Sequence, residues 1–100
     1  MKTVFIYSLS TLEEPDNIKY IGKTLNCINR LKQHLSKYSL KKTNKKSKWI
    51  FSELNKNHNI IITVIDVVPE NEWQFWEQYW ICQFKVWGYN LTNKTPGGDI

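Results

Sequence analysis

The sequence of 100 residues predicts a single α+β domain with the element order β-β-α-α-β-α. Two short segments near the N-terminus are rich in strand-forming residues and are separated by turn formers. Later, residues 60–68 are almost continuously β-branched, and apolar residues recur at helical spacing before and after them. With 41% hydrophobic residues and fourteen aromatics, the composition is that of a globular protein.

The first two strands are expected at residues 4–10 and 18–23. Between them, the tetrapeptide Glu14-Pro15-Asp16-Asn17 consists of residues that favour turns. We therefore predict that the two strands pair as an antiparallel hairpin.

A helix over residues 26–38 is predicted next, because Ile28, Leu31, Leu35 and Tyr38 have the spacing of one apolar stripe. The other side of this helix is expected to carry Asn26, Arg30, Gln33, His34 and Lys37.

The lysine-rich residues 41–48 lead into a second, shorter helix. In that helix Trp49, Ile50 and Leu54 are expected to face inward.

Residues 60–68 end at Pro69 and are predicted to form the central strand. Because the run has almost no polar residue, we expect both of its faces to be buried.

The last helix is predicted to begin with a capping box formed by Asn71 and Gln74, and to end near Trp87 at Gly88. Residues 89–93 are expected to return along the sheet or the helix. This gives a domain over residues 1–93 and a linker-like tail over residues 94–100.

A net charge of +5 and a pI near 9.3 favour anionic partners, either nucleic acid or an acidic membrane. The membrane is the weaker reading, because no basic amphipathic helix has a bulky apolar face left free. Without a signal peptide or an apolar run long enough to span a bilayer, we expect a soluble, intracellular (cytoplasmic) protein.

The two cysteines, Cys27 and Cys82, are far apart and are expected to be reduced helix residues. Together with the only histidines, His34 and His58, they do not have the spacing of a metal cluster. His58 is expected to be a solvated loop residue.

Arg30 is the single arginine in a chain that has thirteen lysines. A planar guanidinium binds phosphate or carboxylate through two parallel hydrogen bonds, which a lysine cannot do. We therefore expect Arg30 to recognise one of these anions.

An acidic residue lies in the middle of an aromatic stripe in the last helix. At about 100° per residue, one narrow helical sector contains Trp73, Glu77, Trp80, Phe84 and Trp87. A carboxylate in such a setting must be paired or bound to a metal, because an unpartnered charge is costly there. Two readings follow, a functional site that uses the acid or a buried ion pair between Glu77 and Arg30. The site is favoured, since buried ion pairs seldom repay their desolvation.

In chain order, the sequence contains Phe5-Ile6-Tyr7, Tyr20-Ile21-Gly22, Arg30, His34 and Glu77. This set resembles the motifs of the GIY-YIG endonuclease domain, over nearly the whole chain from Phe5 to about Asn93. Phe5 replaces the usual first glycine. The resemblance implies a three-stranded antiparallel sheet flanked by helices, hydrolysis of DNA phosphodiesters, and one low-affinity divalent ion, Mg²⁺ or Mn²⁺.

The resemblance also implies catalytic roles. Glu77 matches the carboxylate that binds the metal, and Arg30 the arginine that would clamp the scissile phosphate. Tyr7 is the candidate for orienting or deprotonating the attacking water, assisted by Lys23.

Tyr20 would hydrogen-bond the phosphate or position Tyr7, and His34 would assist proton transfer or contact the leaving side. Asn90 matches the asparagine near the end of the family's domain. Taken singly, each of these residues has a simpler explanation: the tyrosines as ordinary strand residues, His34 as solvated, and Asn90 as a turn former.

Two function classes remain open. One is the metal-dependent catalytic domain of a homing or mobile-element DNA endonuclease, and the other is a non-catalytic nucleic-acid-binding module with the same fold. In both, Lys41, Lys42, Lys45, Lys46 and Asn90 would contact DNA. We expect a monomer, and the linker-like tail leaves open a C-terminal DNA-binding domain that this chain lacks.

Overall fold

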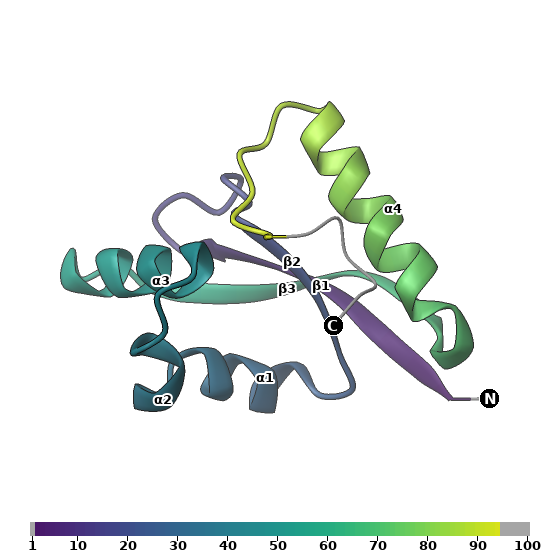
Figure 1. Ribbon diagram of the computed structural model, residues 1–100, viewed down its shortest axis with the longest axis horizontal. Helices are drawn as coiled ribbons and strands as arrows, with labels where there is room; N and C mark the ends of the chain where they lie inside the picture. Colours follow the sequence, from purple (N-terminus) through teal and green to yellow (C-terminus); the bar gives the residue numbers. More distant parts are fainter. Residues whose placement is uncertain (1, 95–100) are drawn as a thin grey trace.

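The computed structural model describes residues 2–94, so residues 95–100 of the predicted linker-like tail lie outside the described residues. In chain order the elements are β1 (Thr3–Thr11), β2 (Tyr20–Thr24), α1 (Cys27–His34), α2 (Lys37–Leu40), α3 (Lys45–Asn55), β3 (Ile60–Pro69), the 3₁₀ turn η1 (Glu70–Glu72) and α4 (Trp73–Val86). The three strands form one antiparallel sheet, with α1, α2 and α3 on one side and α4 on the other (Figure 1). The predicted α+β class with a three-stranded antiparallel sheet is confirmed.

β1 is the central strand, because the sheet order is β2-β1-β3. The prediction that residues 60–68 form the central strand is therefore wrong. β3 lies at an edge, and its Val64 and Val67 are 45% and 52% exposed, so its two faces are not both buried. β-branched residues suit any strand that packs on one face, so the apolar run indicates a strand without locating it in the sheet.

Each face of the sheet has its own hydrophobic core. On the α4 side, Ile6 of β1 and Ile21 of β2 are fully buried and cluster with Ile81 of α4. On the other side, Leu9 of β1 clusters with Ile50 of α3. Successive β1 side chains point to opposite faces, so this one strand contributes to both cores.

The second predicted helix is confirmed as α3. Ile50 is fully buried, and Trp49 and Leu54 pack partly buried against the same core, as expected from their spacing. The helix begins after Asn44, whose side chain accepts a hydrogen bond from the Ser47 N–H.

The helix predicted over residues 26–38 is divided into α1 and α2. Ser36 interrupts it and caps α2 by accepting a hydrogen bond from the Ser39 N–H. Both ends of the predicted apolar stripe are also wrong, since Ile28 and Tyr38 are 69% and 78% exposed. His34, expected on the polar side, is buried instead.

α4 is reached through η1, and the predicted capping box is wrong. The N-cap of α4 is Glu72, which makes no side-chain capping hydrogen bond, because the chain first turns through Glu70–Glu72. The predicted stop is confirmed: α4 ends at Val86, and Gly88 has a φ of +94°. In the part of the chain that the structure describes, no helix combines the length and apolarity that crossing a bilayer requires.

The segment after α4 returns to the sheet and covers the outer edge of β2 (Figure 1). The Thr92 N–H and hydroxyl group both donate to the Lys19 carbonyl. The Asn93 side chain accepts from the Ile21 N–H at 3.0 Å and donates to the Ile21 carbonyl at 2.8 Å. These bonds satisfy backbone groups that an edge strand otherwise leaves unpaired.

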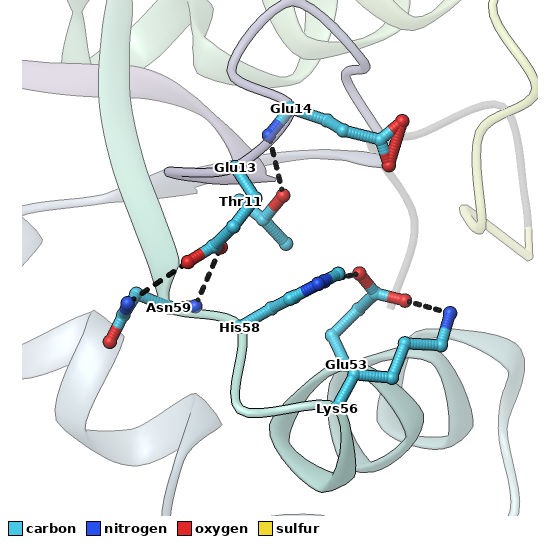
Figure 2. A network of polar contacts seen from close by, with 7 residues as sticks. All are labelled: Thr11, Glu13, Glu14, Glu53, Lys56, His58 and Asn59. Carbon is cyan, nitrogen blue, oxygen red and sulfur yellow. Dashed lines mark hydrogen bonds and ion pairs between the residues drawn. The ribbon is translucent and has the colours of Figure 1, made fainter.

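A second polar network holds the start of β3 against the β1–β2 loop and α3 (Figure 2). Both Glu53 carboxylate oxygens are used, one at 2.9 Å from His58 Nδ1 and one at 3.0 Å from Lys56 Nζ. Glu13 accepts from the backbone and side-chain N–H groups of Asn59. His58 is thus a half-buried partner of Glu53, and its assignment as a solvated residue is wrong.

The Asn93 bridge makes a prediction. Asn93→Ala should lower the free energy of unfolding by roughly 2 kcal/mol, because the Ile21 N–H and carbonyl lose their partners. Urea unfolding measures this loss. Asn90→Ala, an exposed position on the same segment, is the control. Equal stabilities of the two variants would contradict a role for the bridge.

The Glu53 network makes a second prediction. The hydrogen bond from His58 holds the pKa of Glu53 below its ordinary 4.5, against the opposing effect of burial, and Lys56 lowers it further. A folded pKa below the unfolded one stabilises the protein above the ordinary pKa, and that contribution disappears as the pH falls through the folded pKa.

Glu53→Gln should therefore lower stability at neutral pH by roughly 1 kcal/mol and flatten its decline in acid. Urea unfolding across pH 3 to 7 measures both effects. Glu14→Gln serves as the control, because the Glu14 side chain points away from this network (Figure 2). An unchanged acid profile in Glu53→Gln would show that the network does not contribute.

Candidate active site

Four of the predicted site residues, Tyr7, Tyr20, Arg30 and His34, meet where β1, β2 and α1 pack together. The Tyr7 hydroxyl lies 2.7 Å from His34 Nε2 and accepts a hydrogen bond of 3.2 Å from Arg30 Nε. The Tyr20 ring centroid lies 6.2 Å from that of Tyr7 and 5.6 Å from that of His34. The structure therefore joins residues from both motif strands and the first helix into one cluster.

Gly22 makes room for this cluster. It lies opposite Tyr7 in the β1–β2 pairing. A Cβ atom on Gly22 would lie 2.6 Å from the Tyr7 hydroxyl oxygen and 2.9 Å from Tyr20 Cε2, which is too close for either. The glycine is thus required by the two tyrosine side chains that lie over it, rather than only by the end of a strand.

A β-bulge lies beside Tyr7. Ile6 pairs with Asp66 and Tyr7 pairs with Val64, so Ile65 has no partner of its own in β1. Bulges redirect neighbouring side chains and are common next to active sites. Nothing in the β-branched sequence of this strand marks the position of the bulge.

α1 positions Arg30 and His34 one turn apart. The Asn26 side chain caps the helix by accepting from the Asn29 N–H at 3.0 Å. Arg30 is half-buried, and its Nη1 donates to Gln33 Oε1 at 2.9 Å while Nε donates to Tyr7. The guanidinium is held in place from two sides.

Burial is the main cause that raises the pKa of Tyr7 and of Tyr20. The negative charge of Glu77 raises both further, whereas the Arg30 guanidinium acts in the opposite direction. Because both pKa values are raised above the ordinary 10.0, both groups are phenols at neutral pH.

His34 is almost fully buried as well, and its ring contacts a residue that the sequence did not connect with it. Burial lowers the pKa of His34 to about 3, helped by the positive charges of Lys46, Arg30 and Lys42. Lys46 Nζ, from α3, lies 3.0 Å from His34 Nδ1. Lys46 was predicted only as a DNA contact, and no sequence signal separates it from the other lysines.

Glu77 is half-buried on α4, and its effect on both tyrosines places it within electrostatic range of the cluster. The aromatic stripe around it is present in part. Trp73, Trp80 and Phe84 belong to the core on that side of the sheet, but Trp87 is 57% exposed, so its assignment to a buried stripe is wrong.

Two surface hollows meet at Arg30 and Gln33. The larger, of about 420 Å³, is lined by Lys23, Thr24, Leu25, Asn26, Asn29, Arg30 and Gln33. The smaller, of about 250 Å³, is lined by Arg30, Gln33, His34, Ser36, Tyr38, Ser39, Lys42 and Lys46. Arg30 lines both hollows and donates to the buried Tyr7 hydroxyl, so it links that group to each of them.

The other predicted residues lie around these hollows. Lys23 is exposed on β2, with its Nζ 4.5 Å from the ring centroid of Trp73 at the start of α4. Of the four predicted DNA-binding lysines, Lys42 and Lys46 line the smaller hollow, whereas Lys41 and Lys45 are exposed outside it.

Asn90 is exposed on the segment after α4. The asparagine that bonds to the sheet from this segment is Asn93, which the sequence reasoning did not single out.

A metal site in this cluster would rest on Glu77. Within residues 2–94 there is no group of three or more His, Cys, Asp and Glu side chains that could hold an ion. A single carboxylate suits Mg²⁺, which keeps several waters and binds substrate phosphate oxygens in addition to one or two protein carboxylates. The donor set therefore fits a hydrated magnesium ion better than a zinc ion enclosed by protein ligands.

In a comparison with known families, the model of the GIY-YIG catalytic domain matches residues 4–90, a range that contains every predicted site residue. Neither the curated proteins nor the solved structures gave a match.

The close approach at Gly22 makes a third prediction. Gly22→Ala should displace Tyr7 from Arg30 and His34 and destabilise the fold by roughly 1–3 kcal/mol, because the added methyl group overlaps both tyrosine side chains. Urea unfolding and the NMR signals of the His34 ring measure the two effects.

Gly88→Ala is the control for this variant. Its Cβ would meet nothing within 4 Å, so it adds only the backbone strain of a positive φ and should leave the His34 signals unchanged. A Gly22→Ala protein with native stability and native His34 signals would contradict the packing argument.

Proposed function

The chain belongs to the GIY-YIG catalytic domain family, and from this membership we propose that it is a metal-dependent DNA endonuclease. The observation that supports this best is the cluster itself. A buried tyrosine hydroxyl lies between the only arginine and a neutral histidine, and that arginine lines two surface hollows. A fold stabilised by apolar packing has no need for this arrangement.

Arg30 is proposed to bind the scissile phosphate. Its Nε and Nη1 already donate within the protein, and because Arg30 lines both hollows, the remaining N–H groups can meet a phosphate there. The guanidinium would then stabilise the charge that develops on the phosphorus-bound oxygens during hydrolysis.

Glu77 is proposed to hold one Mg²⁺ or Mn²⁺ ion. A bound divalent ion supplies charge neutralisation at the phosphate and lowers the pKa of a coordinated water. Lys23, exposed at the larger hollow, would add positive charge near the attacking water and so favour its deprotonation.

Tyr7 is proposed to orient or deprotonate the water. Its hydroxyl is buried and bonded to Arg30 and His34, so this role requires the cluster to open when DNA binds. Tyr20, which is less buried, would hydrogen-bond the phosphate or hold Tyr7, while His34 would assist the movement of protons.

DNA binding is proposed to extend from the cluster over the surface of α2 and α3. Lys41, Lys42, Lys45 and Lys46 would neutralise phosphates, and Asn90 would add a contact from the segment after α4. A role in a homing or mobile-element endonuclease is proposed as the biological setting.

A non-catalytic DNA-binding module is the second candidate. The full burial of Tyr7 and its raised pKa favour it, because such a phenol is inert while the cluster stays as it is. Cleavage assays separate the two candidates, since only the endonuclease requires Glu77.

The fourth prediction tests the endonuclease. With Mg²⁺ or Mn²⁺, the protein should nick plasmid DNA, and Glu77→Gln should abolish nicking. Arg30→Lys should reduce the single-turnover rate by about a hundredfold or more while DNA binding barely changes, because the charge remains but the forked geometry is lost.

Glu70→Gln and Lys32→Met, at exposed positions on η1 and α1, are the matched controls and should cleave normally. DNA binding without any metal-dependent nicking by the unaltered protein would support the binding module instead.

A further inference from the structure

A continuous chain of polar contacts runs through the cluster from α3 to α1. Lys46 Nζ lies 3.0 Å from His34 Nδ1, and His34 Nε2 lies 2.7 Å from the Tyr7 hydroxyl oxygen. Arg30 Nε donates to the same oxygen at 3.2 Å. Both nitrogens of the His34 ring therefore have a partner.

The partners determine which nitrogen of His34 carries the hydrogen. A lysine ammonium group has N–H donors and no acceptor. At 3.0 Å from this group, Nδ1 can only accept, because an N–H at Nδ1 would face an N–H of the ammonium. A neutral imidazole has one N–H, so the hydrogen is on Nε2 and is donated to Tyr7.

The protonation states of His34 and Lys46 agree with a hydrogen bond donated from His34 to Tyr7. Burial, with the nearby positive charges, lowers the pKa of His34 to about 3, so the ring is neutral at neutral pH. Burial and the charges of Arg30 and Lys42 lower the pKa of Lys46 to about 8, which still leaves most of the amine protonated at neutral pH.

The Tyr7 oxygen consequently accepts from two donors, Arg30 Nε–H and His34 Nε2–H. Donors at the oxygen stabilise the phenolate more than the phenol, so they oppose the effect of burial on this group. The opposite tautomer of His34 would accept the Tyr7 proton and stabilise the phenol instead.

We propose that Lys46 is a positioning residue, whose ammonium group holds His34 as the Nε2–H tautomer and so makes His34 a hydrogen-bond donor to Tyr7. Its catalytic consequence rests on the proposed function, but the tautomer does not. The lysines predicted to contact DNA therefore do not share one role. Lys46 faces the cluster, whereas Lys41 and Lys45 are exposed.

The fifth prediction is tested first by NMR on protein labelled with ¹⁵N-histidine, at neutral pH and without DNA. Long-range ¹H–¹⁵N correlations distinguish a protonated ring nitrogen from an unprotonated one. His34 should show a protonated Nε2 and an unprotonated Nδ1, and this pattern should persist in Lys46→Arg, which keeps a donor-only cation.

In Lys46→Met, which keeps the aliphatic chain, a substantial share of His34 should change to the Nδ1–H tautomer. Lys48→Met, exposed on the same helix, is the matched control and should leave His34 unchanged. His58, bonded to Glu53, should give the same signals in every variant and so reports on folding.

Single-turnover cleavage at saturating DNA then tests the catalytic consequence. Lys46→Met should cleave about ten- to a hundredfold more slowly than the unaltered protein, which is the effect of losing one hydrogen bond to a charged oxygen. The cleavage rate of Lys46→Met should also begin to rise at a higher pH than that of the unaltered protein. Without the hydrogen bond from His34, Tyr7 is harder to deprotonate. Lys46→Arg should restore most of the rate, and Lys48→Met should not differ from the unaltered protein.

Two results would overturn the inference: a protonated Nδ1 on His34 in the unaltered protein, or the same tautomer with and without the Lys46 amine. If the NMR results are as expected but the unaltered protein cleaves no DNA, the tautomer assignment holds and the proposed function fails. If Lys46→Met changes the tautomer but cleaves at the normal rate and pH, the positioning role is wrong.

Discussion

The site depends on the confinement of one hydroxyl group. The Tyr7 oxygen has no access to water, so its hydrogen bonds must come from the protein, and they come from Arg30 and His34 on α1. For these bonds to form, α1 must pack at a fixed position along β1. The residue of β2 opposite Tyr7 must also lack a side chain, as Gly22 does. One buried polar contact therefore couples the register of the hairpin to the position of the helix.

Much of the fold could be predicted from local patterns, because hairpins, helices and their stop signals are encoded in neighbouring residues. Gly88 and the inward face of α3 are examples. The incorrect predictions concern how the strands and helices are arranged relative to one another. The order of strands in the sheet depends on which faces the helices cover. An apolar run such as residues 60–68 does not indicate whether its strand lies at the centre or at an edge.

The site could be predicted as a set of residues but not as an arrangement. The lone arginine and the two aromatic motifs identified Arg30, Tyr7 and Tyr20, which the structure does bring together. The burial of His34 and its contact with Lys46 depend on how α3 packs beside α1, which residue spacing within one helix does not encode. Charge on a lysine in a lysine-rich segment does not reveal which one points inward.

The bridge between Ile21 and Asn93 spans 72 positions in the sequence, so the strand that carries Gly22 is secured by nearly the last described part of the domain. During synthesis, the hairpin and α1 leave the ribosome well before Asn93 does. Contacts of such long range are also the slowest to form in folding, because closing the intervening chain costs entropy first. The Asn93 bridge is therefore expected to form late, so a nascent chain has the residues of the Tyr7 cluster before it has the contact that secures the strand carrying Gly22.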